Sequence, residues 1–285
     1  WNFCAGDLNQ IPTAQNYSVA PESNTPVFMD YANDNGEWIG LVVNHLSGTI
    51  SRLRYGNSLN NNPSITNLGS LGVMPLYLEG IQIVHDGQQW FAFVVGGQRS
   101  QSALIKLNFG NSLLNTPTAV NYGAIGGIDF PVDISIFNKN GKWYAFTVSA
   151  YNNSLTRYDF GDNLDNMPTG INFGNLGNLR YPTGIFGIEE NSDYYLYVVS
   201  QDDNRIIRLN FGNDITSVPS AKDLALVNGT LNAPRDITLI RDCGNNFGFV
   251  VNANSSSLMK LDFGNSLLND APVATDLGNN GNMNF

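Results

Sequence analysis

Two aspartates, Asp133 and Asp236, are the clearest candidates for metal chemistry in this sequence. Each is the third residue of a segment that begins with proline, and the two segments belong to copies of an internal repeat. Carboxylates presented at equivalent places can supply the oxygen ligands that Ca²⁺ prefers. They can equally accept hydrogen bonds from nearby backbone amides, as aspartate commonly does. We therefore expect either no cofactor or a calcium ion held by Asp133 and Asp236.

Histidine and cysteine are too rare for most other metal sites. The chain has two histidines, His45 and His85, and two cysteines, Cys4 and Cys243. This inventory excludes a zinc site built from cysteine and histidine and a centre with several histidines. No histidine or other evident base accompanies the two aspartates, so the sequence shows no complete catalytic constellation.

Amides, carboxylates and aromatic rings gather in the loops that depart most from the repeat. Such groups bind sugar hydroxyls and the apolar faces of sugars. Solvated loops have a similar composition, so this pattern leaves both interpretations open. The candidate binding residues are Tyr151, Asn152, Asn153, Gln201, Asp202, Asp203 and Asn254, with Phe130 and Tyr181 from the connections expected on the same face. We predict that the first six form part of a shallow binding surface.

Composition narrows the classes of partner. The formal net charge is −10, from 24 acidic and 14 basic residues, and this field repels phosphate backbones and anionic lipids. No apolar run reaches the roughly 18 residues needed to cross a bilayer. We therefore expect neither nucleic-acid binding nor membrane insertion, and the hydrophobic content of 42% predicts an ordered core.

An internal repeat dominates the chain. One phrase recurs as RYGNSLNNNPSITNLG from Arg54, NFGNSLLNTPTAVNYG from Asn108 and DFGDNLDNMPTGINFG from Asp159, with further copies from Asn210 and Asp262. A sixth, divergent copy opens the chain. The spacing of about 52 residues is typical of propeller blades.

Each repeat reads as four antiparallel strands. A segment led by proline is followed by a turn such as Asn140-Gly141, then by an apolar run such as WYAFTV, and then by two further strands. We predict an all-β propeller in one domain over residues 1–285, with five complete units and a partial sixth. The expected units are 1–20 (partial), 21–72, 73–125, 126–177, 178–228 and 229–285. Six blades are expected if the natural chain continues, and five if it does not.

Basic residues recur once per repeat in the third strand. A ring of cations can recognise an anionic glycan, but long stems that cover a neighbouring sheet, with heads on acids or carbonyls, are the alternative we favour. The five residues are Arg52, Lys106, Arg157, Arg208 and Lys260.

Two features resemble known families. The stretch PTGI followed by YYLYVVSQDDNRIIRLNFG, over residues 182–212, resembles the NHL repeat, which implies a propeller blade. The phrase FGNSLLNTPTAVNYG resembles tandem repeats of large surface proteins that Bacteroidota export by type 9 secretion, including gliding-motility adhesins. That resemblance implies a secreted or cell-surface location and a role in binding or display within a longer protein.

We therefore expect a non-enzymatic propeller that binds a glycan or another component of the cell surface or extracellular space. This hypothesis rests on a regular repeat without a catalytic constellation. One alternative is a calcium-dependent hydrolase or lactonase with its site at the central channel. Another is a structural spacer or assembly domain.

The two cysteines are expected to form a disulfide. Cys4 replaces the glycine of the repeated phrase, and Cys243 lies in the turn between the first two strands of the last unit. These two kinds of connection emerge on the same face of a propeller, so a Cys4–Cys243 bridge is feasible if the first and last units are neighbours. Two unrelated thiols are the alternative. A bridge would fit an oxidising, extracellular setting.

Overall fold

The computed structural model describes residues 8, 12–14, 24–224, 226 and 229–279. The chain divides into two compact units, residues 17–174 and residues 1–16 with 175–285. The first unit contains three four-stranded blades. Blade 1 is β1 (Pro26–Asp34), β2 (Glu37–Asn44), β3 (Thr49–Gly56) and β4 (Ser64–Gly69); blade 2 is β5 (Leu78–Asp86), β6 (Gln89–Gly96), β7 (Ala103–Gly110) and β8 (Thr118–Asn121); blade 3 is β9 (Pro131–Lys139), β10 (Lys142–Ser149), β11 (Ser154–Gly161) and β12 (Thr169–Gly174).

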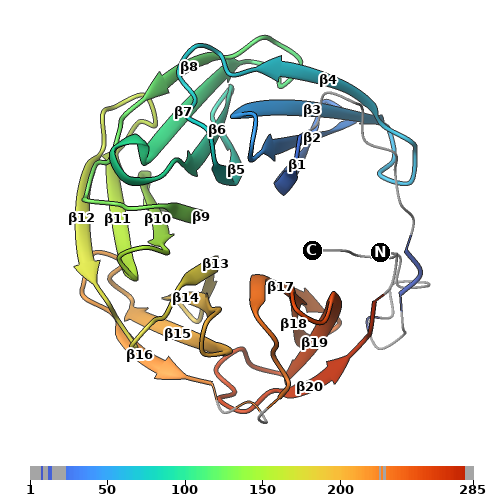
Figure 1. Cartoon of the computed structure of the whole chain (residues 1–285), viewed down its shortest axis with the longest axis vertical. Helices are drawn as coiled ribbons and strands as arrows, with labels where there is room; N and C mark the ends of the chain where they lie inside the picture. Colours follow the sequence, from blue (N-terminus) through green and yellow to red (C-terminus); the bar gives the residue numbers. More distant parts are fainter. Residues whose placement is uncertain (1–7, 9–11, 15–23, 225, 227–228, 280–285) are drawn as a thin grey trace. The chain divides into compact units, whose positions relative to one another are not determined.

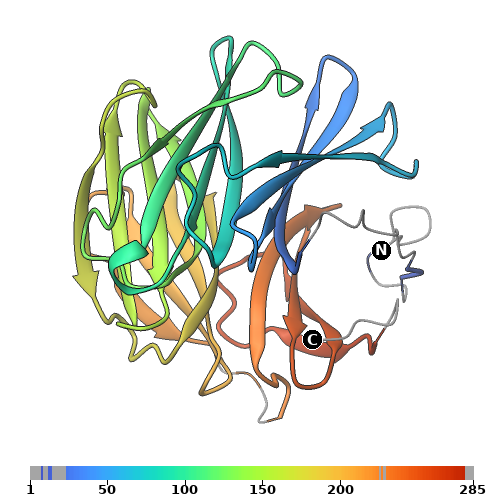
Figure 2. The same cartoon turned by 45° about the horizontal axis from the view of Figure 1, so that its top comes forward.

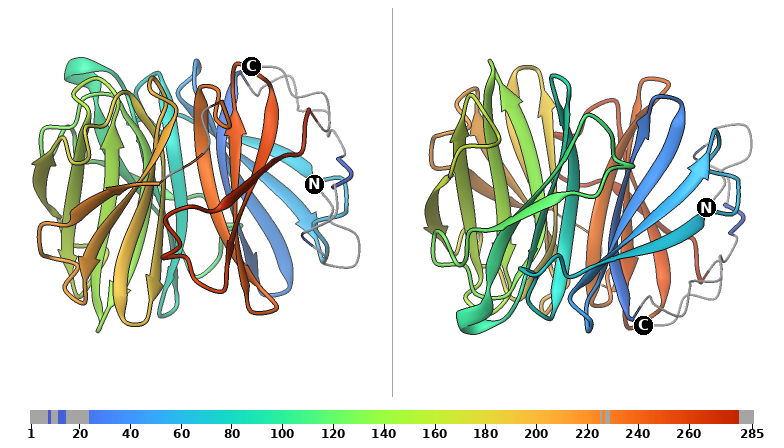
Figure 3. Two further views of the ribbon diagram at one scale, coloured as in Figure 1. Left: turned by 90° about the horizontal axis from the view of Figure 1, so that it is seen from below. Right: turned by 90° about the horizontal axis from the view of Figure 1, so that it is seen from above.

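The second unit contains two further blades of the same kind. Blade 4 is β13 (Pro182–Glu190), β14 (Asp193–Ser200), β15 (Arg205–Gly212) and β16 (Ser220–Asp223); blade 5 is β17 (Pro234–Asp242), β18 (Asn245–Asn252), β19 (Ser257–Gly264) and β20 (Val273–Asp276). Sequential strands pair antiparallel in every blade, as Figures 1 and 3 show. The fold is an all-β propeller of four-stranded antiparallel blades, as the repeat predicted, and it has five blades, a number that the sequence left open. A short 3-10 helix, η2 (Arg99–Gln101), follows β6 and is drawn in teal in Figure 2.

The expected partial sixth unit is not confirmed. Each sheet takes its fourth strand from its own repeat, so no blade requires a strand from the first residues of the chain. Most of residues 1–20 lie outside the described part of the chain. No helix among the described residues is long and apolar enough to cross a bilayer.

The second strand of each blade carries the core. In β6, residues Phe91 to Val95 are buried on both faces, which is why this run is continuously apolar instead of alternating. Side chains from adjacent blades of the three-blade unit pack together, for example Phe93 against Phe160 at 5.0 Å between ring centroids. The two-residue turns Asn35-Gly36 and Asn140-Gly141 have positive φ at both positions, as the tight hairpin requires.

The repeated phrase closes the turn after the third strand. The asparagine two residues before the proline of the phrase donates its amide N–H to the carbonyl of the aromatic residue six positions earlier. This bond joins Asn61 to Tyr55, Asn115 to Phe109 and Asn166 to Phe160, at 2.8, 2.9 and 2.9 Å respectively. The phrase is therefore turn chemistry, and its regularity has a structural cause.

The recurring cations of the third strand are structural as well. Arg157, at 4% exposure, pairs with Asp159 at 2.6 Å, and Lys106 pairs with Asp165 of the next blade at 2.6 Å. Arg208 pairs in the same way with Asp270 at 2.6 Å. This arrangement confirms the favoured alternative, in which the long stems cover apolar surface while the heads meet acids or carbonyls.

Candidate functional site

Three carboxylates lie along the first strands of the three-blade unit. They are Asp30 on β1, Glu79 on β5 and Asp133 on β9, and β5 packs against both of the other strands. Few carboxylates are buried in proteins unless they are paired, hydrogen-bonded or functional. Glu79 and Asp133 are buried and Asp30 is partly buried, on the first strands of three successive blades, and this marks the region as the best candidate for chemistry.

Glu79 is the most deeply buried of the three, at 1% exposure. Its Oε1 lies 2.8 Å from Nδ1 of His45, which is in the loop between β2 and β3. His45 Nδ1 is also 3.1 Å from the carbonyl oxygen of Leu78, and the imidazole packs edge-on against Tyr77. The other carboxylate oxygen, Oε2, is buried and accepts no hydrogen bond from the described residues. A buried acceptor without a partner costs stability, so Oε2 is the atom of this carboxylate whose bonding the described residues leave incomplete.

Asp133 lies against the residue that follows Glu79. A Cβ built on Gly80 would be 2.6 Å from the Asp133 Cα and 3.0 Å from its Oδ1, so only glycine permits this approach. The same Oδ1 accepts the N–H of Ile134 at 2.8 Å. Glycine at position 80 therefore brings the two carboxyl-bearing residues to adjoining backbone positions.

Asp30 lies farther along the strand and is held by backbone groups. Its Oδ2 accepts the N–H of Ile83 on β5 at 2.7 Å, and its Oδ1 accepts the N–H of Tyr31 at 2.8 Å. Burial raises the pKa of this carboxyl above its ordinary value, and the two N–H bonds partly oppose that rise. Ile83 is three residues beyond Gly80, so Asp30 meets β5 about 10 Å from Asp133.

In the two-blade unit, Asp236 on β17 repeats the arrangement of Asp133. A Cβ on Gly184 of β13 would be 2.7 Å from the Asp236 Cα, and Asp236 Oδ1 accepts the N–H of Ile237 at 2.7 Å. Burial raises the pKa of Asp236 from 3.8 to about 6, against the opposing effects of this bond and of the Arg235 charge. Arg235 in turn donates to Gln201 at 3.0 Å.

The expected calcium ligands thus each bond a local amide. Among the residues that the structure describes, no group of three or more His, Cys, Asp or Glu side chains is placed to hold a metal ion. Asp133 and Asp236 belong to different compact units. Calcium at these residues stays a prediction.

In the three-blade unit, the predicted binding residues form a compact aromatic cluster. Phe130 is buried and packs at a tilt against Tyr151, with the ring centroids 4.8 Å apart, and the guanidinium of Arg99 lies 4.5 Å over the Tyr151 ring. Arg99 also pairs with Asp129 at 3.0 Å. Asn152 is exposed and donates to the carbonyl of Gly127 at 2.9 Å. Asn153 is partly exposed and has positive φ, which is a turn role.

Phe130 and Tyr181 occupy a position whose backbone conformation is the same in every repeat. The residue just before each first strand has positive φ, between 51 and 63°, and its carbonyl accepts an N–H from the end of the second strand or the loop after it. This backbone conformation recurs in all five blades, which gives it a structural cause. The five residues are Thr25, Tyr77, Phe130, Tyr181 and Ala233.

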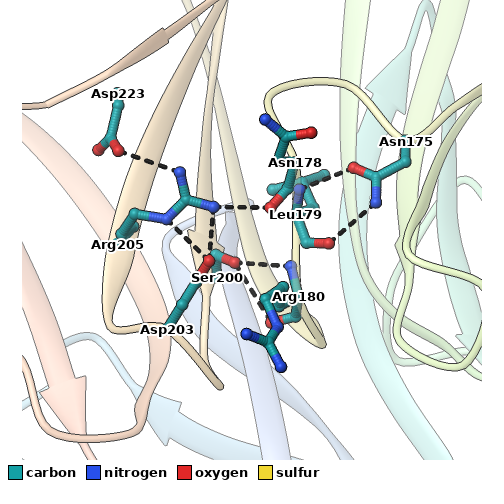
Figure 4. A network of polar contacts seen from close by, with 8 residues as sticks. All are labelled: Asn175, Asn178, Leu179, Arg180, Ser200, Asp203, Arg205 and Asp223. Atoms are coloured by element: carbon teal, nitrogen blue, oxygen red, sulfur yellow. Dashed lines mark hydrogen bonds and ion pairs between the residues drawn. The ribbon is translucent and has the colours of Figure 1, made fainter.

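In the two-blade unit, a polar network occupies the predicted loop (Figure 4). Arg205 binds Asp203 at 2.8 Å through Nε, Asp223 at 3.0 Å and the carbonyl of Asn178 at 2.6 Å. Ser200 and Asn175 brace the neighbouring backbone at residues 179–180. Asp203 is therefore a partner of Arg205, whereas Asp202 is exposed. Asn254 is exposed in the loop after β18.

The predicted disulfide stays untested. Cys243 is exposed in the turn between β17 and β18, where it has positive φ. The neighbouring Asp242 raises the pKa of its thiol. Cys4 lies outside the described residues.

Sequence reasoning missed Glu79, Asp30 and the role of His45. One signal was present: Glu79 occupies the second position of a first strand, where the blade 3 and blade 4 copies have Val132 and Thr183. A charged residue at a position that two other blades bury indicates a special role, but blade 5 has the charged Arg235 there, so the signal was weak.

No protein-family model and no curated protein sequence matches the chain. Solved structures do share its fold. A functionally unknown protein from Desulfotomaculum acetoxidans matches 88% of this chain and 69% of its own, at 18% identity and a TM-score of 0.58. A GH43 β-xylosidase/α-arabinofuranosidase from a compost microbial metagenome matches 89% and 91%, at 11% identity and a TM-score of 0.56. An exo-β-1,3-galactanase from Clostridium thermocellum matches 86% and 57%, at 14% identity and a TM-score of 0.52.

These comparisons correct one expectation. A non-enzymatic binding domain was predicted because the sequence shows no catalytic constellation. That expectation is overturned, because similar structures of named function include glycoside hydrolases, several of them GH43 enzymes. At 9 to 18% identity the similarity itself establishes the fold. Any catalytic residues must therefore be identified from the geometry of this chain.

Proposed function

We propose that the protein is a glycoside hydrolase whose site is built on Glu79, His45 and Asp133 of the three-blade unit. The observation that carries this proposal is the buried Glu79 carboxylate, which contacts His45 through one oxygen, while its other oxygen has no partner within the described part of the chain. The fold shared with GH43 enzymes supports the same reaction class.

Glycoside hydrolysis requires one carboxyl group that donates a proton to the departing oxygen and a second carboxylate on the other side of the bond. In this proposal Glu79 donates the proton, and the imidazole of His45, 2.8 Å away, returns a proton to it. Asp133 is the second carboxylate and takes a proton from the attacking water. The glycosidic C–O bond breaks and a new C–O bond to the water oxygen forms. Asp133 then releases its proton to solvent and His45 takes one up, which restores the starting state.

The substrate class is a neutral oligosaccharide or polysaccharide. Similar structures are named for β-xylosidase, α-arabinofuranosidase and β-1,3-galactanase activity, and one was solved with xylotriose. The acidic surface charge of this chain is compatible with an uncharged substrate and disfavours a polyanion. An extracellular location would bring such an enzyme to its glycans, and the predicted secretion is tested by fractionating cells that express the full natural protein.

The proposal is tested with an isosteric pair of variants. Wild-type protein is assayed against xylotriose, β-1,3-galactan and the p-nitrophenyl glycosides of xylose and arabinofuranose, with product sugars quantified by chromatography. Glu79→Gln removes the proton and keeps the shape, so we expect kcat to fall by about 10²- to 10⁴-fold. Asp133→Asn should cause a loss of similar size.

The matched control is Glu37→Gln. Glu37 forms a surface ion pair with Arg54 at 2.7 Å, so its removal should leave kcat within about twofold. Circular dichroism and thermal melts verify folding of each variant. Absence of hydrolysis of every glycan by the folded wild-type protein, or full activity in Glu79→Gln, would overturn the proposal.

A further inference from the structure

A shallow polar cavity lies at the other end of blade 2. Its volume is about 610 Å³, in the range of small-molecule sites. It is formed by the turn between β5 and β6, the end of β7 and the loop that leads to β8. The lining residues are Gln88, Gln89, Asn108, Phe109, Gly110, Asn111, Asn115, Thr116 and Thr118.

The position of this cavity separates it from the proposed catalytic residues. Glu79 is the second residue of β5, and the cavity begins after Asp86, the last residue of that strand. Seven residues of extended strand span about 23 Å. The cavity is also at the opposite end of the blade from the loop after β6, which contains Arg99.

The lining carries amides and hydroxyls and no charged side chain. Asn108 donates its amide to Gln89 Oε1 at 3.1 Å, and its own Oδ1 accepts the N–H of Gly110 at 2.8 Å. Gln88 and Thr116 are exposed at the rim. Such a surface offers both donors and acceptors without a net charge, which suits vicinal hydroxyl groups and disfavours ions.

Comparison with blade 1 shows that this neutrality is specific to blade 2. Asn108 and Arg54 are at the same register of the third strand, and Gln89 and Glu37 at the same place of the second. In blade 1 these positions close an ion pair, with Arg54 Nε 2.7 Å from Glu37 Oε1. Blade 2 replaces both charges with amides while keeping the backbone. Asn108 is held by Gln89 and, at 3.3 Å, by Asp165 Oδ1, which leaves the exposed Gln88 and Thr116 at the rim to contact an uncharged ligand.

We propose that this cavity is a second, non-catalytic binding site for a neutral glycan, contacted by Gln88, Gln89 and Thr116. Carbohydrate as the ligand class rests on the proposed function, since a hydrolase of long glycans gains residence time from a second contact with the same chain. The location and polarity of the site come from the cavity itself.

Binding is measured on wild-type protein with xylotriose by isothermal titration and with soluble xylan and β-1,3-galactan by affinity electrophoresis. The double variant Gln88→Ala/Thr116→Ala should weaken binding of at least one of these glycans at least tenfold. Its kcat on a p-nitrophenyl glycoside, which is too short to reach both sites, should stay within twofold. The matched control Glu37→Ala, at the equivalent turn of blade 1, should leave glycan binding unchanged.

The outcomes separate this inference from the proposed hydrolase. A protein that binds glycan through the blade 2 cavity but hydrolyses none retains this inference and loses the proposed function. A protein that binds none of the three glycans, or whose double variant binds as tightly as wild type, overturns the second site. Glu79→Gln should keep the cavity binding, and its loss in that variant would also contradict a separate site.

Discussion

Aspartates have different roles in this chain, depending on the residues that pack around them. Asp203 neutralises Arg205, and Asp159 neutralises Arg157, so both are parts of ion pairs. Asp236 has no comparable partner and is held by the N–H of Ile237. Its carboxyl is therefore the one whose charge costs most to keep, and that cost is visible as a raised pKa.

The first prediction is that Asp236 makes stability depend on pH. Its folded pKa of about 6 lies above the ordinary 3.8, so its protonated form is favoured by folding. The stabilisation is complete below about pH 4 and is lost as pH rises through about 6. Asp236→Asn keeps the acceptor for Ile237 and removes the titration. The free energy of unfolding of this variant minus that of wild type should therefore be up to about 3 kcal/mol higher at pH 8 than at pH 4.

Urea unfolding of both proteins at pH 4, 6 and 8 measures this difference. The exposed Asp202 provides the matched control, since Asp202→Asn should show no such trend. A difference between Asp236→Asn and wild type that is the same at all three pH values would contradict the assignment.

The first strands of the blades share a sequence pattern but not an environment. The fourth residue of this strand is Met29 in β1 and Ile134 in β9. Ile134 is 4% exposed because β9 packs against β5, whereas Met29 is 49% exposed. Position in the repeat therefore determines which way a side chain points, and the neighbouring element determines whether it is buried.

The next prediction concerns these equivalent positions. Ile134→Ala deletes buried methyl groups and should lower the free energy of unfolding by about 2–5 kcal/mol. Met29→Ala removes a side chain that is half exposed and should cost less than about 1 kcal/mol. Denaturant unfolding of the two variants checks the contrast. An equal loss in both would show that the Met29 face is covered in solution.

At the scale of the whole molecule, basic and acidic residues have different roles. Basic residues are few, and those recurring in the third strands are committed to internal contacts such as Lys106 with Asp165. The acidic excess is left to the surface, which gives the net charge of −10. The long-range field is therefore negative, which disfavours polyanionic partners and keeps the protein dispersed at neutral pH.

A final prediction joins distant parts of the chain. A Cys4–Cys243 disulfide would close a loop of about 240 residues and could stabilise the protein by up to about 5 kcal/mol in the chain-entropy model. Mass spectrometry of the unreduced protein after denaturation in an alkylating agent should find one linked peptide pair. Two alkylated cysteines would refute the bridge, and a Cys243→Ser variant with unchanged thermal stability would deny it any stabilising role.

The sequence by itself determined the strands, their order within a blade and their turns. These features are local: continuous apolar runs specify the buried second strands, Asn-Gly specifies the tight hairpin, and the asparagine of the repeated phrase reaches a carbonyl only six residues away. The shared environment of the recurring cations followed from their regular spacing, although acids such as Asp165 and Asp270 reach Lys106 and Arg208 from the next blade.

The candidate site was decided only by the tertiary structure. Glu79 meets His45, and Asp133 meets Gly80, because strands from successive blades stack against each other, and these contacts join residues more than thirty positions apart. The local pattern gives only a weak signal of which carboxylate will be buried, the charge at the second position of β5, since the first strands otherwise look alike until their neighbours are in place. The candidate site residues could not be identified from the repeat alone, because the same local motif occurs in environments that differ only through packing between blades.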